Sequence, residues 1–329
     1  MSADITPDIP PDITVIGAGL AGLACARVLA DAGMAVQVLD KGRGIGGRMA
    51  TRRVALEGAA LRFDHGAQYV TARDPGFAAL LADAASAGAA AVWDDTGPRP
   101  RYTGVPGMSA LPRHLGAGLA VAQGTTVTAL RPGPGGWALQ TSAGIMTTPR
   151  LVLAIPAPQA AALLGGDHAL SGALGAVEMA PCLTLMAAFP AGAAPQLPPD
   201  TQFEADADHP LAWIARDSSK PGRAHEGITG WVAQAGPEWS AQHLDADFAR
   251  ITARMLPLLA ARLELDPAEA LHASAHRWRY ARVARPLGAP FLAEAQAGLW
   301  LGGDWCLAAR AEAAWQSGQA MAADILARG

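Results

Sequence analysis

The sequence predicts an α/β fold with a parallel sheet, because two apolar strand-like runs are each followed by a glycine-rich turn and a helical pattern. The first run begins at Ile13 and its helix ends at Gly33, whereas the second begins at Gly298 and leads to a helix from about Arg310. The length of 329 residues suits two domains with separate buried cores. We therefore expect the two ends of the chain to meet in one domain.

The first of these units has the spacing of a dinucleotide-binding turn. Its turn is Gly17-Ala18-Gly19-Leu20-Ala21-Gly22, and the next strand ends in Asp40. The first glycine permits the turn, the second lets the backbone approach a pyrophosphate, and the third allows the helix to pack closely on the strand. An acid about twenty residues further on accepts hydrogen bonds from an adenosine ribose. The turn predicts a bound dinucleotide but does not separate FAD from NAD.

Composition argues against several other classes. With 51% hydrophobic and 16% charged residues the chain is typical of a globular protein. A net charge of −4 without a long basic run argues against nucleic acid or a membrane as partner. Cys25, Cys182 and Cys306 are far apart, so we expect no disulfide framework, no metal site and a cytoplasmic location. The stretch before Ile13 predicts a disordered tail and lacks the features of a secretory signal.

The residues after Asp40 shift the expected ligand to FAD. The run KGRGIGGRMAT, residues 41–51, resembles the Arg-x-x-Gly-Gly-Arg extension of the amine-oxidase-like FAD family. Gly46 and Gly47 would let the chain pass close beneath the cofactor, and Arg48 could hold a phosphate. The expected cofactor is therefore FAD, bound without a covalent link.

Three further segments are expected to complete the FAD site. The segment FDHGAQY, residues 63–69, resembles the stretch that passes the flavin ring in the same family, and we assign His65 no role in proton transfer. Val127 would lie on the strand that meets the adenine. Asp304 would bond the ribityl or phosphate region, and the helix start after it would stabilise negative charge on the flavin. The full expected set of cofactor contacts is Gly17, Gly19, Leu20, Ala21, Gly22, Asp40, Lys41, Arg43, Gly46, Gly47, Arg48, Met49, Gly66, Ala67, Gln68, Tyr69, Val127, Gly303, Asp304, Glu312 and Ala314.

The chain as a whole resembles the renalase family, especially its bacterial branch, within the flavin amine oxidase and NAD(P)-binding Rossmann-like superfamily. The resemblance rests on segments spread over nearly the whole chain, namely KGR at 41–43, FDHGAQYVTARD at 63–74, VPGMS at 105–109, IPAPQ at 155–159, MAPC at 179–182, SSKP at 218–221, HRWRYAR at 276–282 and GDWC at 303–306. It implies oxidation of the 2- or 6-dihydro isomers of NAD(P)H to NAD(P)+, with hydride transfer to flavin N5. Oxygen would then be reduced to hydrogen peroxide.

We assign no catalytic side chain, because hydride loss from a dihydropyridine restores an aromatic ring and requires no base. The expected substrate pocket is lined by Tyr69, Trp213, Gln234, Trp278, Tyr280 and Trp305. Where many relatives have a histidine, this chain has Gln234, which keeps a polar contact but does not titrate.

Two other functions stay open at this point. A flavin amine oxidase would share the cofactor motifs, but enzymes of that fold usually hold a lysine and a water near flavin N5. The only lysines here are Lys41, beside the adenosine site, and Lys220, which is followed by proline. A catalytically idle flavin-binding protein is the second alternative.

The expected fold class is α/β, a Rossmann-type FAD-binding domain with a parallel sheet plus an inserted mixed α/β substrate domain, in an amine-oxidase-like, p-hydroxybenzoate-hydroxylase-like topology. We expect the FAD-binding domain in residues 1–75, 105–156 and 285–329, and the substrate domain in 76–104 and 157–284.

Strand-like runs at 183–189, 211–215 and 227–232 are expected to form a sheet of the substrate domain that covers the flavin. Residues 245–263 have apolar positions at helical spacing and predict a packing helix.

Overall fold

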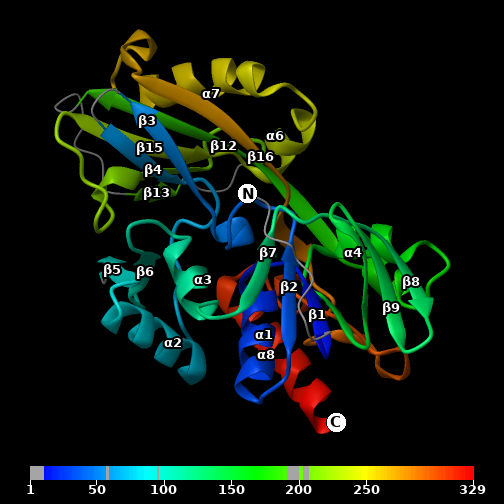
Figure 1. Cartoon of the computed structure of the whole chain (residues 1–329). Helices are drawn as coiled ribbons and strands as arrows, with labels where there is room; N and C mark the ends of the chain where they lie inside the picture. Colours follow the sequence, from blue (N-terminus) through cyan, green and yellow to red (C-terminus); the bar gives the residue numbers. More distant parts are fainter. Residues whose placement is uncertain (1–10, 57–58, 95, 191–199, 203–206) are drawn as a thin grey trace. The chain divides into compact units, whose positions relative to one another are not determined.

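The computed structural model describes residues 11–56, 59–94, 96–190, 200–202 and 207–329, in two compact units (Figure 1). Unit 1 comprises residues 1–47, 112–178 and 283–329, and unit 2 comprises residues 48–111 and 179–282. Most of the tail that precedes Ile13 lies outside the described residues.

The core of unit 1 is a six-stranded sheet in the order β17-β18-β11-β1-β2-β7. All neighbours in it are parallel except the edge pair of β17 and β18, which is antiparallel. The strands are β1 (Ile13–Ile16), β2 (Val36–Asp40), β7 (Ala120–Gln123), β11 (Leu151–Leu153), β17 (Leu292–Glu294) and β18 (Leu299–Leu301). Strands β1, β11 and β18 are buried at every position, as expected of strands covered on both faces. The predicted parallel α/β domain is therefore confirmed.

Helices α1 (Leu20–Asp31) and α8 (Ala311–Ala327) lie side by side next to this sheet (Figure 1). Their close approach depends on small residues, since a Cβ at Gly318 would lie 2.3 Å from the carbonyl oxygen of Ala21. The first and last helices of unit 1 thus pack directly against each other.

The rest of unit 1 is a three-stranded antiparallel sheet and short helices. The strands are β8 (Val127–Gly133), β9 (Gly136–Thr141) and β10 (Gly144–Thr148), in the order β10-β9-β8, and the helices are α4 (Ala157–Leu164), α5 (Ser171–Gly175), η4 (Ala295–Ala297) and η5 (Asp304–Cys306). Helix α3 (Ala110–Leu115) and the turn η1 (Gly47–Met49) cross the boundary between the units.

Unit 2 contains a five-stranded sheet in the order β13-β14-β15-β12-β16. Its strands are β12 (Glu178–Pro190), β13 (Asp200–Gln202), β14 (Trp213–Arg216), β15 (Ile228–Gln234) and β16 (His272–Arg285). Helices α6 (Pro237–Gln242) and α7 (Phe248–Arg262) occur along one face, and the hairpin of β3 (Thr51–Leu56) and β4 (Ala59–Asp64) packs on the other (Figure 1). Beside them are α2 (Pro75–Ser86), β5 (Ala90–Asp94), β6 (Arg101–Gly104), η2 (Asp217–Ser219) and η3 (Pro267–Glu269).

The predicted packing helix corresponds to α7, which begins later than expected because the Asp247 side chain caps it by accepting from the backbone N–H of Arg250 at 2.7 Å. Ile251, Met255 and Leu259 on its inner face are fully buried against the sheet. None of the helices in the described part of the chain is long and apolar enough to span a membrane.

The unit boundaries differ from the expected ones in two long stretches and two short ones, the short ones being residues 105–111, which lie in unit 2, and residues 283–284, which lie in unit 1. Residues 48–75 were expected in the FAD-binding domain but belong to unit 2, because Leu61 and Phe63 of β4 pack against Met186 and Val232 of the large sheet. Residues 157–178 were expected in the substrate domain but belong to unit 1.

Candidate functional site

The turn between β1 and α1 contains two glycines that the protein itself requires. Gly17 has a φ of +111°, and a Cβ there would lie 2.4 Å from the carbonyl oxygen of Ala154. A Cβ at Gly22 would lie 1.9 Å from the carbonyl oxygen of Gly17. Both positions therefore exclude any side chain, as the dinucleotide motif predicts.

Gly19 is different, because no neighbouring protein atom would clash with a side chain's Cβ at that position. Its backbone is extended, with φ −80° and ψ 177°, and an added Cβ would meet nothing within 4 Å. A Cβ at Gly47 would be 3.5 Å from the Gly19 Cα, so the two glycines border the same space. Gly19 also precedes α1, whose N-terminus has no side-chain cap. Open space beside uncapped N–H groups fits a pyrophosphate, so these residues fit FAD.

Asp40 is positioned to hold a ribose. Its carboxylate accepts the backbone N–H groups of Ala18 and Gly42, each at 2.6 Å. A carboxylate has about four lone-pair sites, so it can accept further bonds from ribose hydroxyls. The carbonyl oxygen of Asp40 accepts the N–H of Thr125 at 2.9 Å, which brings the segment leading to Val127 to the same end of the sheet. This arrangement fits the adenosine end of the cofactor.

The C-terminal part of unit 1 supplies a second strand and helix. The N–H of Gly303 donates to Ser317 Oγ at 2.9 Å, and Asp304 begins η5 with its side chain buried. Glu312 and Ala314 are buried in the first turns of α8. Trp305, expected in the substrate pocket, is completely buried in unit 1 and donates its indole N–H to the carbonyl oxygen of Ile155 at 3.0 Å. We therefore leave Trp305 out of the proposed substrate pocket.

The predicted cofactor residues divide between the two units. Unit 1 contains Gly17, Gly19, Leu20, Ala21, Gly22, Asp40, Lys41, Arg43, Gly46, Gly47, Val127, Gly303, Asp304, Glu312 and Ala314, and unit 2 contains Arg48, Met49, Gly66, Ala67, Gln68 and Tyr69. Lys41 and Arg43 are solvent-exposed, whereas Arg48 is half-buried and donates to the carbonyl oxygen of Ala281 at 3.1 Å.

In unit 2 the segment after β4, residues 65–69, is held by many bonds to its backbone; we name it the 65–69 segment. Trp278 donates its indole N–H to the carbonyl oxygen of His65 at 2.7 Å. The carbonyl oxygen of Gly66 accepts two side-chain amides, Gln234 Nε2 at 2.7 Å and Gln68 Nε2 at 3.1 Å. The N–H of Ala67 donates to the carbonyl oxygen of Arg48 at 2.9 Å. Gln234 and Trp278, expected to contact substrate, thus donate their side-chain N–H groups to the protein backbone.

An aromatic group lies at the end of the 65–69 segment. The Tyr69 ring is 5.9 Å from Trp213 and 6.4 Å from Trp93, and the guanidinium of Arg101 lies over it at 4.8 Å. Register pairs Trp213 with Gln234, so both side chains share the sheet face that carries the β3–β4 hairpin. On β16, Ala273 and Ala275 pack in the cluster that contains α7. Side chains alternate along a strand, so Trp278 and Tyr280 belong to the opposite face, the one that carries the hairpin. Unit 2 therefore contains five of the six predicted pocket residues, and four of them share one sheet face.

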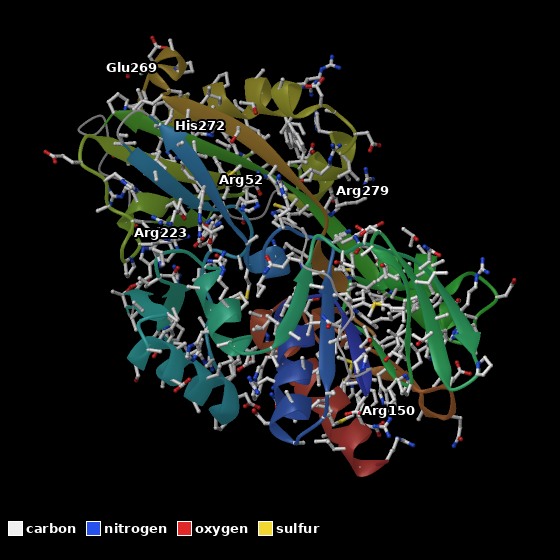
Figure 2. The ribbon with its side chains drawn as sticks, viewed as in Figure 1. Arg52, Arg150, Arg223, Glu269, His272 and Arg279 are labelled. Carbon is white, nitrogen blue, oxygen red and sulfur yellow. The ribbon has the colours of Figure 1, made fainter. Side chains whose placement is uncertain are left out.

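Four charged side chains form a fully buried network behind this segment; we name Asp64, Asp217, Lys220 and Arg223 the charge cluster. Lys220 Nζ donates to Asp64 Oδ2 at 3.2 Å, to Asp217 Oδ1 at 2.7 Å and to Gln68 Oε1 at 3.0 Å. Arg223, labelled in Figure 2, contacts Asp64 at 2.6 Å and Asp217 at 3.0 Å. Two carboxylates balance two cations, so the cluster is electrically neutral.

Neighbouring polar groups add further hydrogen bonds to Asp64 of the charge cluster. Asp64 also accepts the Thr51 hydroxyl at 2.8 Å and the N–H of Met108 at 2.9 Å. Burial alone would raise the pKa of Asp217, but Lys220 and Arg223 outweigh it and hold that pKa below its ordinary value. Asp217 therefore stays ionised beside Lys220 and Arg223.

The charge cluster was not predicted from the sequence. Asp64 and Lys220 occur in segments that carried the family resemblance, but no spacing rule joins residues 156 positions apart. The one usable signal was the spacing of a lysine and an arginine three and six positions after Asp217.

His65 of the 65–69 segment and His276 next to it are neutral at neutral pH. Burial, with a smaller contribution from Arg52, lowers the pKa of His65 to about 4. Burial, with His65 and Arg52, lowers the pKa of His276 to about 3. Their rings are 4.5 Å apart and the His276 ring is 4.6 Å from Trp278, both in edge-on arrangements, so they belong to an aromatic cluster. These pKa values agree with assigning His65 no role in proton transfer at neutral pH.

The three cysteines are buried and free of disulfides. Burial raises the pKa of Cys25 and of Cys306 to about 12 and that of Cys182 to about 11. A thiol with such a pKa is a weak nucleophile at neutral pH, which favours non-covalent binding of the cofactor. Among the described residues no group of three or more His, Cys, Asp or Glu side chains has a metal-binding arrangement.

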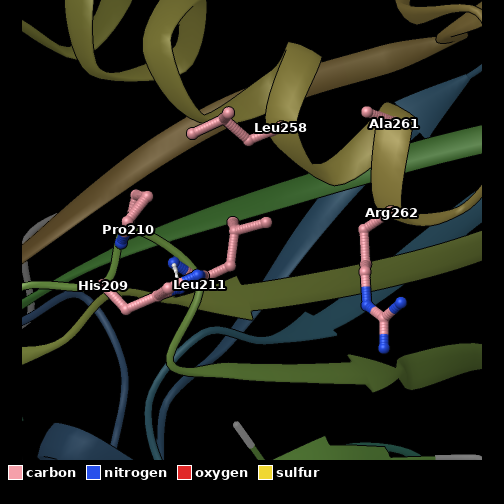
Figure 3. A pocket seen from close by; sticks show the side chains of 6 residues that line it. All are labelled: His209, Pro210, Leu211, Leu258, Ala261 and Arg262. Atoms are coloured by element: carbon pink, nitrogen blue, oxygen red, sulfur yellow. Dashed lines mark hydrogen bonds between the residues drawn. The ribbon is translucent and has the colours of Figure 1, made fainter. Parts of the chain in front are cut away.

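A shallow depression of about 360 Å³ lies elsewhere in unit 2, between α7 and the loop before β14 (Figure 3). Pro210 and Leu211 line it from the loop, and Leu258 and Ala261 line it from α7. It therefore lies on the α7 face of the sheet, whereas Trp213 and Gln234 belong to the opposite face. This depression has no part in the candidate site.

Comparisons with known proteins agree with this geometry. Residues 15–84 match the NAD(P)-binding Rossmann-like domain. An L-amino-acid oxidase of Echis ocellatus is 53% identical over 49 residues, which are 15% of this chain and only 10% of that relative's length.

Two solved structures share the fold at low sequence identity. A protein assigned as a protoporphyrinogen oxidase from Exiguobacterium sp. 255-15 has a TM-score of 0.74 and 14% identity over 96% of this chain and 99% of that chain. Wild-type putrescine oxidase bound to putrescine has a TM-score of 0.68 and 14% identity over 98% of this chain and 100% of that chain.

The family model described as flavin containing amine oxidoreductase matches residues 77–326, which is more than half of the chain. The predicted FAD cofactor and the predicted class of enzyme are confirmed by this match, whereas no comparison tests the narrower renalase resemblance. The chain belongs to the flavin containing amine oxidoreductase family and is an FAD-dependent oxidoreductase.

Proposed function

We propose that this enzyme oxidises the 2- or 6-dihydro isomers of NAD(P)H to NAD(P)+, with dioxygen as electron acceptor. The observation that carries the proposal is the bonding of Lys220. Its ammonium has three N–H donors, and Asp64, Gln68 and Asp217 accept all three inside a fully buried cluster. No donor remains for the water that amine oxidases of this fold hold with a lysine.

The other lysine does not fill that role. Lys41 is exposed in unit 1 directly after Asp40, where the adenosine end of the cofactor is expected. An enzyme that removes a hydride from a dihydropyridine needs no lysine for proton transfer, because the product ring becomes aromatic without loss of a proton.

We name the surface formed by Tyr69, Trp213 and Gln234 the aromatic face. It suits a planar substrate without positive charge. Tyr69 and Trp213 offer aromatic surfaces to a substrate. Gln234 lies beside Trp213 on the same sheet face. Arg101 already stacks on Tyr69, and a second cation at this ring would be repelled by the guanidinium. These contacts favour a neutral or anionic nicotinamide compound over an alkylammonium ion.

The chain's own contribution is positioning. Bound FAD would supply the redox chemistry: it would accept the hydride at N5, and dioxygen would take up the electron pair, the N5 hydrogen as a proton and one further proton from solvent to become hydrogen peroxide. The aromatic face would orient the dihydropyridine ring, and the bonds to Gly66 and Ala67 would keep the 65–69 segment rigid while it does so. His65 and His276 stay neutral and remove no proton.

Oxidation of a small amine is the second candidate, favoured by the family match over residues 77–326. It would require Lys220 to leave at least one of its three partners. The two candidates therefore predict different substrates for the same cofactor and the same sheet face.

The test is anaerobic stopped-flow absorbance of the flavin band after mixing the holoenzyme with a 2- or 6-dihydro isomer of NADH. Ordinary NADH and putrescine serve as comparisons. We expect rapid bleaching by an isomer alone. Bleaching by putrescine alone would replace the proposal by amine oxidation, and bleaching by ordinary NADH at the same rate as the isomers would contradict the isomer preference.

A further inference from the structure

The Gly66–Ala67 peptide is fixed at both ends. The carbonyl oxygen of Gly66 accepts amide hydrogens from Gln68 and Gln234, and the N–H of Ala67 donates to Arg48. A Cβ at Gly66 would lie 2.0 Å from the carbonyl oxygen of Arg48, so the backbone itself fills the space on that side. The peptide has little freedom to rotate.

The direction of the Gln68 amide depends on Lys220. An amide has one oxygen that accepts and one nitrogen that donates, and an ammonium can bond only the oxygen. Lys220 Nζ contacts Gln68 Oε1 at 3.0 Å, so Nε2 must face the other way, toward the carbonyl oxygens of Asp64 and Gly66. A reversed amide would place its oxygen against both carbonyl oxygens.

We propose that Lys220 is a positioning residue that acts through Gln68 on the Gly66 carbonyl. The chain of bonds runs from Lys220 to Gln68 and then to Gly66, where Gln234 of β15 meets it from the other side. This inference rests on the proposed function only in taking the 65–69 segment as the place where substrate and flavin meet.

Stability alone does not account for a buried lysine here. Buried ion pairs are costly to desolvate, and apolar side chains of similar volume often stabilise a core equally well. An apolar side chain at position 220 could fill the space but could not orient the Gln68 amide. The function of the cation is therefore the direction it imposes on that amide.

Arg223 offers a matched control within the same cluster. Like Lys220 it is a fully buried cation bonded to Asp64 and Asp217. Its other bonds go to Thr103 and to the carbonyl oxygen of Gly104, and not to Gln68. Replacing either cation by methionine removes one buried positive charge, but only Lys220→Met removes the partner of the Gln68 oxygen.

The experiment compares Lys220→Met, Gln68→Met, the double variant and Arg223→Met by two measurements on the holoenzyme. Hydrogen–deuterium exchange of the Ala67 amide reports the geometry of the peptide without any substrate. Anaerobic flavin reduction, with whichever compound reduces the wild type, gives the limiting rate constant and the apparent substrate Kd separately.

We expect Lys220→Met and Gln68→Met each to accelerate Ala67 exchange and to lower the limiting rate constant about tenfold, with little change in the apparent Kd. The double variant should be no worse than either single variant, because both interrupt one chain of bonds. Arg223→Met should lose stability but leave Ala67 exchange unchanged within about twofold.

Two results would overturn the inference. One is Ala67 exchange that responds to Arg223→Met as strongly as to Lys220→Met, because the cluster would then act only as a structural unit. The other is unchanged Ala67 exchange in Gln68→Met, a variant that keeps all four charges and so tests the chain even if Lys220→Met does not fold. Neither result depends on which substrate the enzyme oxidises.

Discussion

Gly19 of unit 1 and Gly66 of unit 2 are both glycines in predicted cofactor segments, but they are glycine for opposite reasons. A side chain at Gly19 would meet no protein atom within 4 Å, whereas one at Gly66 would lie 2.0 Å from the carbonyl oxygen of Arg48. At Gly19 the chain keeps space and uncapped N–H groups open for a ligand. At Gly66 the chain fills the space with its own backbone.

The difference extends to the surroundings of each glycine. Around Gly19 the protein supplies local backbone groups and one carboxylate, Asp40, which keeps acceptor capacity for a ligand. Around Gly66 the side chains of Gln68, Gln234 and Trp278 are already bonded to the backbone. Unit 1 thus has open space and acceptor groups that fit a cofactor. Unit 2 has a rigid segment supported by a buried charge cluster.

The largest expected effect is on the stability of unit 2, when a charge of the cluster behind the 65–69 segment is removed. Lys220→Met leaves two buried carboxylates with one cation, and it should lower the free energy of unfolding of unit 2 by about 3–5 kcal/mol. Lys41→Met, at the exposed lysine of unit 1, should change it by less than about 0.5 kcal/mol. Urea unfolding of both variants, followed by tryptophan fluorescence, checks the contrast, and equal midpoints would contradict it.

A smaller loss is expected when the packed glycine is altered. Gly66→Ala should destabilise unit 2 by about 1–3 kcal/mol, because the added methyl overlaps the carbonyl oxygen of Arg48 and the backbone must shift. Thermal unfolding of the apoprotein measures this effect. An unchanged transition would mean that the segment is less rigid than its bonds indicate.

The open glycine should behave in the opposite way. Gly19→Ala should leave apoprotein stability unchanged or slightly higher, and weaken FAD binding about tenfold, because the methyl enters the space reserved for the pyrophosphate. Titration of apoprotein with FAD gives the Kd. Gly22→Ala is the matched control and should destabilise the apoprotein itself, since its Cβ would lie 1.9 Å from the carbonyl oxygen of Gly17. Unaltered FAD affinity in Gly19→Ala would remove the pyrophosphate from this position.

The smallest expected effect is the change in the stability of unit 2 with pH. Burial lowers the pKa of His65 to about 4 and that of His276 to about 3, so the unfolded chain binds more protons than the folded one below the ordinary histidine pKa. Stability should therefore be complete above about pH 6.5 and fall as the pH drops toward about 4.

Between pH 7 and pH 6 the loss should be under about 1 kcal/mol for His65, and smaller for the more exposed His276. Unfolding midpoints measured at several pH values test this slope. His276→Gln should flatten it, and an identical slope in that variant would contradict the assignment.

Much of unit 1 could be predicted from the sequence, including the glycines of the first turn, Asp40 at the end of β2 and the strand that leads to Asp304. In unit 2 the pocket residues Tyr69, Trp213 and Gln234 were also expected together: Trp213 and Gln234 share one sheet face, and the Tyr69 ring lies 5.9 Å from Trp213. The direction of the polar atoms of Gln234 and Trp278 was not predicted, because alternation along a strand gives the face of a side chain but not its hydrogen-bond partner.

The sequence by itself determined the glycine-rich turn of unit 1, the start of α1 and the acid at the end of β2, because these are set by backbone conformation within a short stretch of chain. Only the tertiary structure decided the role of Lys220. Its partners Asp64 and Gln68 lie 156 and 152 positions away, and they meet it because the β3–β4 hairpin packs on the large sheet of unit 2. Burial at that contact turns a lysine that would ordinarily be solvated into the fixed partner of an amide.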